Sequence, residues 1–169
     1  GHVSARSDKR PEHFLISRSL APALVTAGDM MELDADSEPL PGDKRKGFIE
    51  RYIHGEIYRA RPEVMAIVHS HSPSVVPFSV SSVKLKPICH MSAFLAEGVP
   101  NFEIRDGFGM TDLLIRDNKQ GRALAEVHLR SGVDPAARVR LIADLLVDDL
   151  AARADRDHPV AASRGEDDR

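Results

Sequence analysis

Two histidines, His69 and His71, are the residues whose types and spacing most directly indicate chemistry. They stand where the apolar run VMAIV ends in a Ser-Pro turn. In an extended segment, side chains two positions apart project from the same face, so both imidazoles can reach one metal ion. Neutral imidazole suits zinc, manganese or iron, and a catalytic site needs a third protein ligand. The other interpretation, surface or hydrogen-bonded structural histidines, stays open on spacing alone.

Glu50 is a carboxylate that can be brought to this histidine pair. It lies in a segment where apolar residues recur at spacings of four and three and which Pro62 ends, a pattern typical of an amphipathic helix. The apolar positions of this helix are Ile49, Ile53, Ile57 and Ala60. A helix-turn-strand hairpin would fold Glu50, which shares a helix face with His54, back toward the histidines. A carboxylate beside a metal can act as general acid or base, whereas a surface glutamate would pair with Arg51 or Arg59.

Strand-length and helical segments alternate along the chain and must position these side chains. Five short apolar runs have strand length: 13–16, 30–33, 64–69, 86–89 and 101–104. Helices are predicted at 48–60, after the Ser72-Pro73 cap, in two pieces over 111–129, and at 134–150 after the Asp134-Pro135 cap. Strands interleaved with helices at this spacing predict a sheet covered by helices, which is an α/β layered fold.

Composition limits the functions that this chain can have. Its 169 residues, 42% hydrophobic and 29% charged, fit one globular domain, predicted over 1–154, followed by a polar tail at 155–169. The formal net charge of -3, without a dense basic run, argues against nucleic-acid binding. No apolar stretch approaches the ~20 residues of a membrane span or resembles the core of a signal peptide, and the one cysteine, Cys89, fits a reducing compartment. We therefore expect a cytoplasmic protein that acts on a small molecule and binds neither nucleic acid nor membrane.

The order of the motifs resembles the class II aldolase/adducin family. From Gly1 to about Leu129, the chain carries G-x-x-S, an Arg/Ser loop, E-x-x-x-H and then R-P-E-x-x-x-I-V-H-S-H. In that family the two histidines at the strand end bind a divalent metal, and the glutamate four residues before the helical histidine is the acid/base. The resemblance implies that His69 and His71 hold zinc or manganese and that Glu50 is catalytic. It also implies a three-layer α/β/α sandwich with a central mixed, largely antiparallel sheet, assembled as a homo-oligomer, commonly a tetramer.

Four segments resemble the branch of the family that decarboxylates hydroxylated aromatic or pyridine dicarboxylates: SRSLAPALVTAGDM, IHGEIYRARPEV, HSHSPSVVPF and HMSAFLAEGVPNFEIRD. Family aldolases that act on sugar phosphates hold the phosphate with Gly-Asn, Thr-Gly and Ser-Ser pairs. This chain has Gly1-His2, Arg18-Ser19 and Phe48-Ile49 at those places. Apolar side chains in place of two serine hydroxyls make a poor environment for a dianion, so we expect no phosphosugar substrate.

Arg18 is the candidate for holding a substrate carboxylate. A guanidinium can bind a planar carboxylate through two hydrogen bonds. In this interpretation His2, Ser4, Ser17 and Ser19 are neighbouring substrate-binding donors. A structural arginine tied to a nearby acid is an equally good interpretation of Arg18.

One metal-binding motif of the family is changed in this chain. The family's third metal histidine lies in an R-G-H-G segment, whereas here Arg164-Gly165 is followed by Glu166. The favoured function is a divalent-metal lyase that decarboxylates a hydroxylated aromatic or heteroaromatic carboxylate through a metal-stabilised enolate-type intermediate. The alternatives are an aldolase or epimerase acting on a sugar-type substrate, and a non-catalytic, adducin-like interaction module.

Overall fold

The fold is that of a computed structural model, which describes residues 1–96 and 98–130. The helix predicted at 134–150, the tail predicted at 155–169 and the motif ending at Glu166 lie outside these described residues. No helix in the described part of the chain is long and apolar enough to span a membrane.

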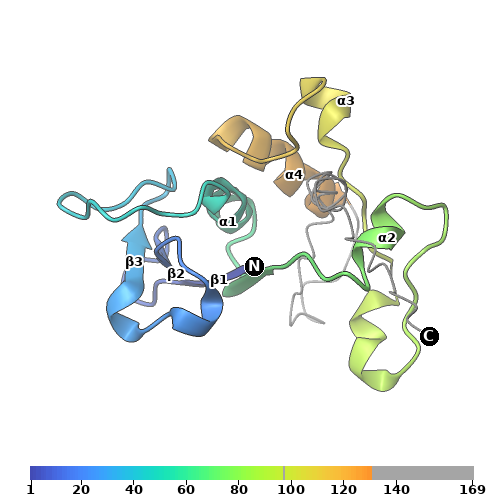
Figure 1. Ribbon diagram of the computed structural model, residues 1–169, viewed down its shortest axis with the longest axis horizontal. Coiled ribbons are helices and arrows are strands. Elements are labelled where there is room, and N and C mark those ends of the chain that lie inside the picture. Colours follow the sequence, from blue (N-terminus) through green and yellow to red (C-terminus); the bar gives the residue numbers. More distant parts are fainter. Residues whose placement is uncertain (97, 131–169) are drawn as a thin grey trace, which may run out of the picture.

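A four-stranded sheet forms one layer of the molecule (Figure 1). Its strands are β1 (His2–Arg6), β2 (Phe14–Ser17), β3 (Met30–Leu33) and β4 (Ala66–His69), in the order β3-β2-β1-β4. Every neighbouring pair is antiparallel. β1 therefore lies between β2 and the distant β4, and its pairing with β4 sets His2 opposite His69.

Helices lie on one side of this sheet. α1 (Arg51–Ala60) is next to the sheet, and α4 (Asn118–Arg130) packs against α1 (Figure 1). The two helices approach closely enough to require a glycine, because a Cβ on Gly121 would lie 2.6 Å from the carbonyl oxygen of Tyr52. The other described helical elements are α2 (Val76–Ser79), α3 (Ile104–Phe108) and 3-10 turns at Pro22–Leu24, Ala27–Asp29 and His90–Leu95.

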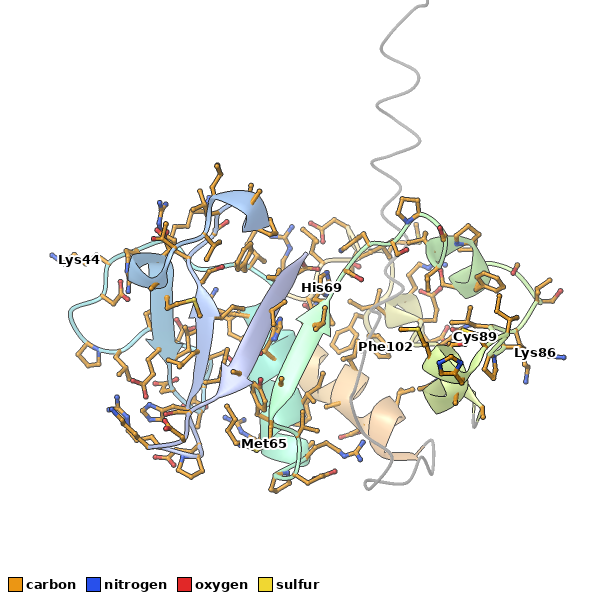
Figure 2. All side chains as sticks on the ribbon, turned by 90° about the horizontal axis from the view of Figure 1, so that it is seen from below. Lys44, Met65, His69, Lys86, Cys89 and Phe102 are labelled. Atoms are coloured by element: carbon orange, nitrogen blue, oxygen red, sulfur yellow. The ribbon has the colours of Figure 1, made fainter. Side chains whose placement is uncertain are left out.

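The core lies between the sheet and α1 and continues to α3 and α4. Alternate residues of each strand point into it, as the two-residue period of a strand requires. Its largest fully buried apolar side chains are Phe14, Ile16, Met31, Leu33, Ile53, Ile57, Ile67, Ile104, Ile115 and Leu124. The same alternation turns Val3 and Met30 away from the core, and both side chains are exposed. Figure 2 shows the sheet with α1 behind it.

The α/β fold class predicted from the sequence is confirmed. β3 coincides with the predicted strand 30–33, β2 and β4 overlap the predicted strands 13–16 and 64–69, and α2 follows the Ser72-Pro73 turn. β1 was not recognised from its sequence. Within the described residues the sheet is wholly antiparallel and helices lie on one of its two faces.

Two of the predicted strands are wrong. Residues 86–89 form no strand, and Ile88 is 94% exposed, because no strand among the described residues pairs with this apolar run. Residues 101–104 lead instead into α3. The carboxylate of Glu103 accepts a hydrogen bond from the backbone N–H of Arg105, a helix cap that a short apolar run does not reveal.

Two predicted helices have different bounds. α1 begins at Arg51 rather than at the start of the predicted segment 48–60, so Glu50 is its N-cap residue and does not lie inside the helix. Of the predicted segment 111–129, only the part belonging to α4 is helical. Leu113 has a φ of 67°, a left-handed conformation that interrupts any right-handed helix before α4.

Candidate metal and acid/base site

The antiparallel pairing of β1 with β4 builds the centre of the site. His2 and His69 are directly opposite each other in adjacent strands, so their side chains emerge side by side on the same face of the sheet. The two rings stack with their centroids 4.5 Å apart and their planes at 9°. Both side chains are buried, and Figure 2 shows His69 at the end of β4.

Glu50 approaches these two histidines from the N-cap position of α1. Its Oε2 atom lies 3.5 Å from Nε2 of His2 and 3.6 Å from Nε2 of His69. Both separations are longer than an ordinary hydrogen bond. Nε2 of His2 and Oε1 of Glu50 are both buried, and neither atom has a hydrogen-bond partner among the described residues. Buried polar atoms of this kind are what a bound ion or substrate would satisfy.

His71 follows the end of β4 and turns back toward His69. The Nε2 atoms of the two rings lie 2.7 Å apart. His71 is exposed, whereas His69 is buried, so the pair reaches from the interior to the surface. The structure thus brings together Glu50, His69 and His71, the three residues that the sequence singled out for metal binding and acid/base chemistry.

The side chains of this cluster fit a divalent cation. One ligand atom from each of His2, Glu50 and His69 can be chosen so that all three lie within 4.8 Å of one another, and His71 adjoins them. Imidazole nitrogens with a carboxylate oxygen form a donor set that zinc and manganese accept. His2, which the sequence assigned to substrate binding, therefore belongs to the central cluster.

Burial and neighbouring charges set the protonation of the cluster. Burial alone would raise the pKa of the Glu50 carboxyl, but the surrounding His2, His69 and His71 together hold that pKa below its usual value. Burial lowers the pKa of His2, and the adjacent Glu50 only partly opposes this effect. At neutral pH the cluster therefore holds an ionised Glu50 beside a neutral His2.

A second layer of polar side chains lies behind His2. Nε2 of His54 lies 2.7 Å from Nδ1 of His2, Nδ1 of His54 lies 2.6 Å from Oγ of Ser4, and this Oγ lies 2.8 Å from the Tyr58 hydroxyl. Burial lowers the pKa of His54 well below its usual value and raises the pKa of Tyr58 to about 12. The sequence assigned Ser4 to the substrate, gave His54 no role and did not identify Tyr58. The four-residue spacing of positions 50, 54 and 58 was the signal that could have found them.

The remaining predicted substrate-binding residues lie around the end of β2. Nε of Arg18 donates to Oδ1 of Asp29 at 2.6 Å, which is the structural ion pair of the second interpretation. Ser17 closes β2, and the backbone N–H of Ser19 donates to the carbonyl oxygen of Lys46. Among the described residues, no hydrogen bond or ion pair links Arg18 to the histidine cluster.

Known proteins are similar in sequence to this chain. Residues 1–136 match the family described as the Class II Aldolase and Adducin N-terminal domain. The chain is 42% identical over 131 residues to the decarboxylase tropJ of Talaromyces stipitatus, across 75% of this chain and 49% of that protein. It is 32% identical over 97 residues to the 3,4-dihydroxyphthalate decarboxylase of Arthrobacter keyseri, across 52% of this chain and 38% of that protein.

A solved structure is also similar to this chain. It is an aldolase II superfamily protein from Pseudomonas syringae, which superposes with a TM-score of 0.48 at 29% identity, across 56% of this chain and 39% of that chain. The chain spans about half the length of tropJ and a smaller share of the other two proteins.

Proposed function

This chain belongs to the class II aldolase and adducin family, and on that premise we propose that it is a divalent-metal lyase that decarboxylates a hydroxylated aromatic or heteroaromatic carboxylate. Two similar proteins are named decarboxylases, and one of the names specifies 3,4-dihydroxyphthalate, a hydroxylated aromatic dicarboxylate. The observation that carries the proposal is the convergence of Glu50, His69 and His71 at the end of β4.

His69 and His71 would hold the metal, with Glu50 and His2 beside it. A divalent cation bound there supplies a Lewis acid for the negative charge that develops on the substrate as carbon dioxide leaves. The buried side of the cluster, at His2 and His69, is shielded from water, whereas exposed His71 marks the side from which a substrate can enter.

Glu50 is the residue that moves a proton in this proposal. Its lowered pKa keeps the carboxylate ionised, so it can accept the proton of the substrate hydroxyl. Loss of carbon dioxide leaves the electron pair of the broken carbon–carbon bond on the ring carbon. Glu50 then returns the proton to that carbon, which replaces the carboxylate by hydrogen, and the substrate oxygen, which is still deprotonated, takes a proton from water.

Arg18 is proposed to contact a second carboxylate of the substrate, with Ser17 and Ser19 as neighbouring donors. Its Nε is occupied by Asp29. No described residue pairs with its Nη groups, so part of the guanidinium fork is available to a planar carboxylate.

Metal content tests the first half of the proposal. Plasma mass spectrometry on the full chain, purified without a His-tag, should find about one divalent ion per chain, the stoichiometry of a single catalytic site. The double variant His69→Ala/His71→Ala should lose the ion. A folded wild-type chain that binds no metal would contradict the lyase and favour the interaction module.

The variant Glu50→Gln tests the second half. Removing the acid/base should lower kcat for release of carbon dioxide from hydroxy-aromatic carboxylates by at least about 100-fold, with the metal content unchanged. Glu38→Gln is the matched control, because the Glu38 carboxylate contacts Arg51 and Tyr52 outside the cluster. Full turnover in Glu50→Gln would contradict the assignment of Glu50 as the acid/base.

A homo-oligomer, specifically a tetramer, is part of the same proposal. Exposed apolar side chains outside residues 80–96, among them Val3, Met30 and Met65, are surface that such an assembly would cover. Light scattering on the full chain gives the assembled mass. A mass of 18.6 kDa, that of one chain, would contradict assembly.

A further inference from the structure

A buried hydrogen-bond chain lies behind His2, and the function proposed so far makes no use of it. It runs from the Tyr58 hydroxyl to Oγ of Ser4, from Ser4 to Nδ1 of His54, and from Nε2 of His54 to Nδ1 of His2. The three separations, 2.8, 2.6 and 2.7 Å, are those of ordinary hydrogen bonds. Ser4, His54 and Tyr58 are all buried, so bulk water does not compete for these groups.

The periods of β1 and α1 explain why four polar groups line up here. His2 and Ser4 are alternate residues of β1 and point to the same side of the sheet. His54 and Tyr58 are one helical turn apart on α1 and point to the same side of the helix. The two pairs interleave where α1 packs on the sheet, which places His54 between His2 and Ser4.

The direction of the hydrogen bonds is fixed at the Tyr58 end. A hydroxyl has one proton to donate. Of two ring nitrogens that face each other at hydrogen-bond distance, one carries the proton and the other accepts it. If Ser4 donated to Tyr58, the Tyr58 proton would need another acceptor, but among the described residues Ser4 is the one hydrogen-bond partner of that hydroxyl. A buried donor without an acceptor is unfavourable. Tyr58 therefore donates to Ser4, Ser4 donates to His54, and Nε2 of His54 donates to Nδ1 of His2.

The other end of the chain agrees with this direction. Because Nδ1 of His2 accepts, the proton of its ring lies on Nε2. This N–H faces Oε2 of Glu50 at 3.5 Å. The opposite direction would set a nitrogen lone pair against the lone pairs of a carboxylate, which repel each other.

We propose that Tyr58, Ser4 and His54 are positioning residues that hold the proton of His2 on Nε2, directed at the Glu50 carboxylate, so that His2 is not a metal ligand. Metal binding then depends on His69 and His71. Oε1 of Glu50, which is buried and has no described partner, is the oxygen left for proton transfer with the substrate. The inference rests on the acid/base role proposed for Glu50 and extends it into the interior between β1 and α1.

The position of the ring protons can be measured directly. Long-range ¹H–¹⁵N NMR of the histidine side chains, recorded on the full metal-free chain at neutral pH, distinguishes a proton on Nε2 from one on Nδ1. We expect His2 and His54 both to carry it on Nε2. Tyr58→Phe should shift His2 toward a mixture of the two tautomers, whereas Tyr52→Phe should leave it unchanged, because the Tyr52 hydroxyl bonds to Glu38 and Arg51. A proton on Nδ1 of His2 in the wild-type chain would overturn the inference.

Metal binding and kinetics give two further readouts. His2→Ala should change zinc affinity less than about tenfold, whereas His69→Ala should lower it by more than about 100-fold. Tyr58→Phe should lower kcat about tenfold, the effect of one misplaced hydrogen bond, with KM unchanged. Loss of zinc in a folded His2→Ala chain to the same extent as in His69→Ala would overturn the inference.

Failure of the inference and failure of the proposed function give different results. If the wild-type chain binds metal and releases carbon dioxide but carries the His2 proton on Nδ1, the proposed function is supported and the inference is contradicted. If it carries the proton on Nε2 but releases no carbon dioxide, the proposed function is contradicted and the hydrogen-bond arrangement is supported.

Discussion

Two regions of this molecule, the site corner and the outer segment, are held in place by different kinds of contact. The site corner consists of β1, β4 and α1, and its bonds join residues distant in the sequence, such as His2 to His54 and Ser4 to Tyr58. The outer segment, residues 80–96, is held by local bonds such as those between Cys89 and Ser92. Figure 2 shows His69 near the middle of the molecule and Cys89 toward one side of it.

The difference lies in what each region buries. Apolar and polar side chains in the site corner are enclosed by elements from three separate parts of the sequence. In the outer segment, Val83, Ile88 and Met91 stay exposed. Because buried apolar area and satisfied buried hydrogen bonds provide most of the stability of a fold, the site corner should tolerate little change and the outer segment much.

The largest expected contrast is between two identical substitutions. Ile53 is fully buried under the sheet, so Ile53→Ala should lower the free energy of unfolding by about 3 kcal/mol through lost burial and a cavity. Ile88→Ala in the outer segment should change it by less than about 0.5 kcal/mol. Urea unfolding followed by circular dichroism measures both. Equal losses in the two variants would break the comparison and show that the outer segment is buried in solution.

A smaller loss of stability is expected when a methyl group is added in the site corner at a position that has no space for it. A Cβ on Gly55 would lie 1.9 Å from Oγ of Ser37, a buried residue with a φ of 67°. Gly55→Ala should therefore cost about 2 kcal/mol of stability through overpacking. Gly107→Ala in α3 is the matched control, since its Cβ would meet nothing within 4 Å, and it should stabilise by about 0.5 kcal/mol through helix propensity. A stability gain in Gly55→Ala would contradict the packing described for α1.

The smallest expected effect is on how the free energy of unfolding depends on pH. The pKa of buried His54 lies well below its ordinary value of 6.5, so below that value the unfolded chain takes up a proton that the folded chain does not. The free energy of unfolding should therefore fall as the pH is lowered toward about pH 5, by about 1.4 kcal/mol per pH unit for this group. Unfolding measured over a pH series should show a shallower slope in His54→Gln than in the wild type. An unchanged slope in His54→Gln would remove His54 as its source.

The sequence by itself predicted the features that depend on neighbouring residues. The two-residue spacing of His69 and His71 at a strand end, the strand 30–33 and the helix carrying Ile53 all follow from periods of two or 3.6 residues, which act over a few positions. The motif order added Glu50 to the histidine pair. Together with the motif order, these local patterns were sufficient for the fold class and for three residues of the candidate site.

Only the tertiary structure decided which distant elements meet. The pairing of β1 with β4 sets His2 against His69, and the packing of α1 under β1 connects His54 and Tyr58 to Ser4. Nothing in the local pattern of β1 specifies its partner strand, because strand register is set by which apolar faces can be buried together. For the same reason 86–89, an apolar run without such a partner in the described part of the chain, is not a strand. Local periods determine what an element is, and burial against the rest of the chain determines what it touches.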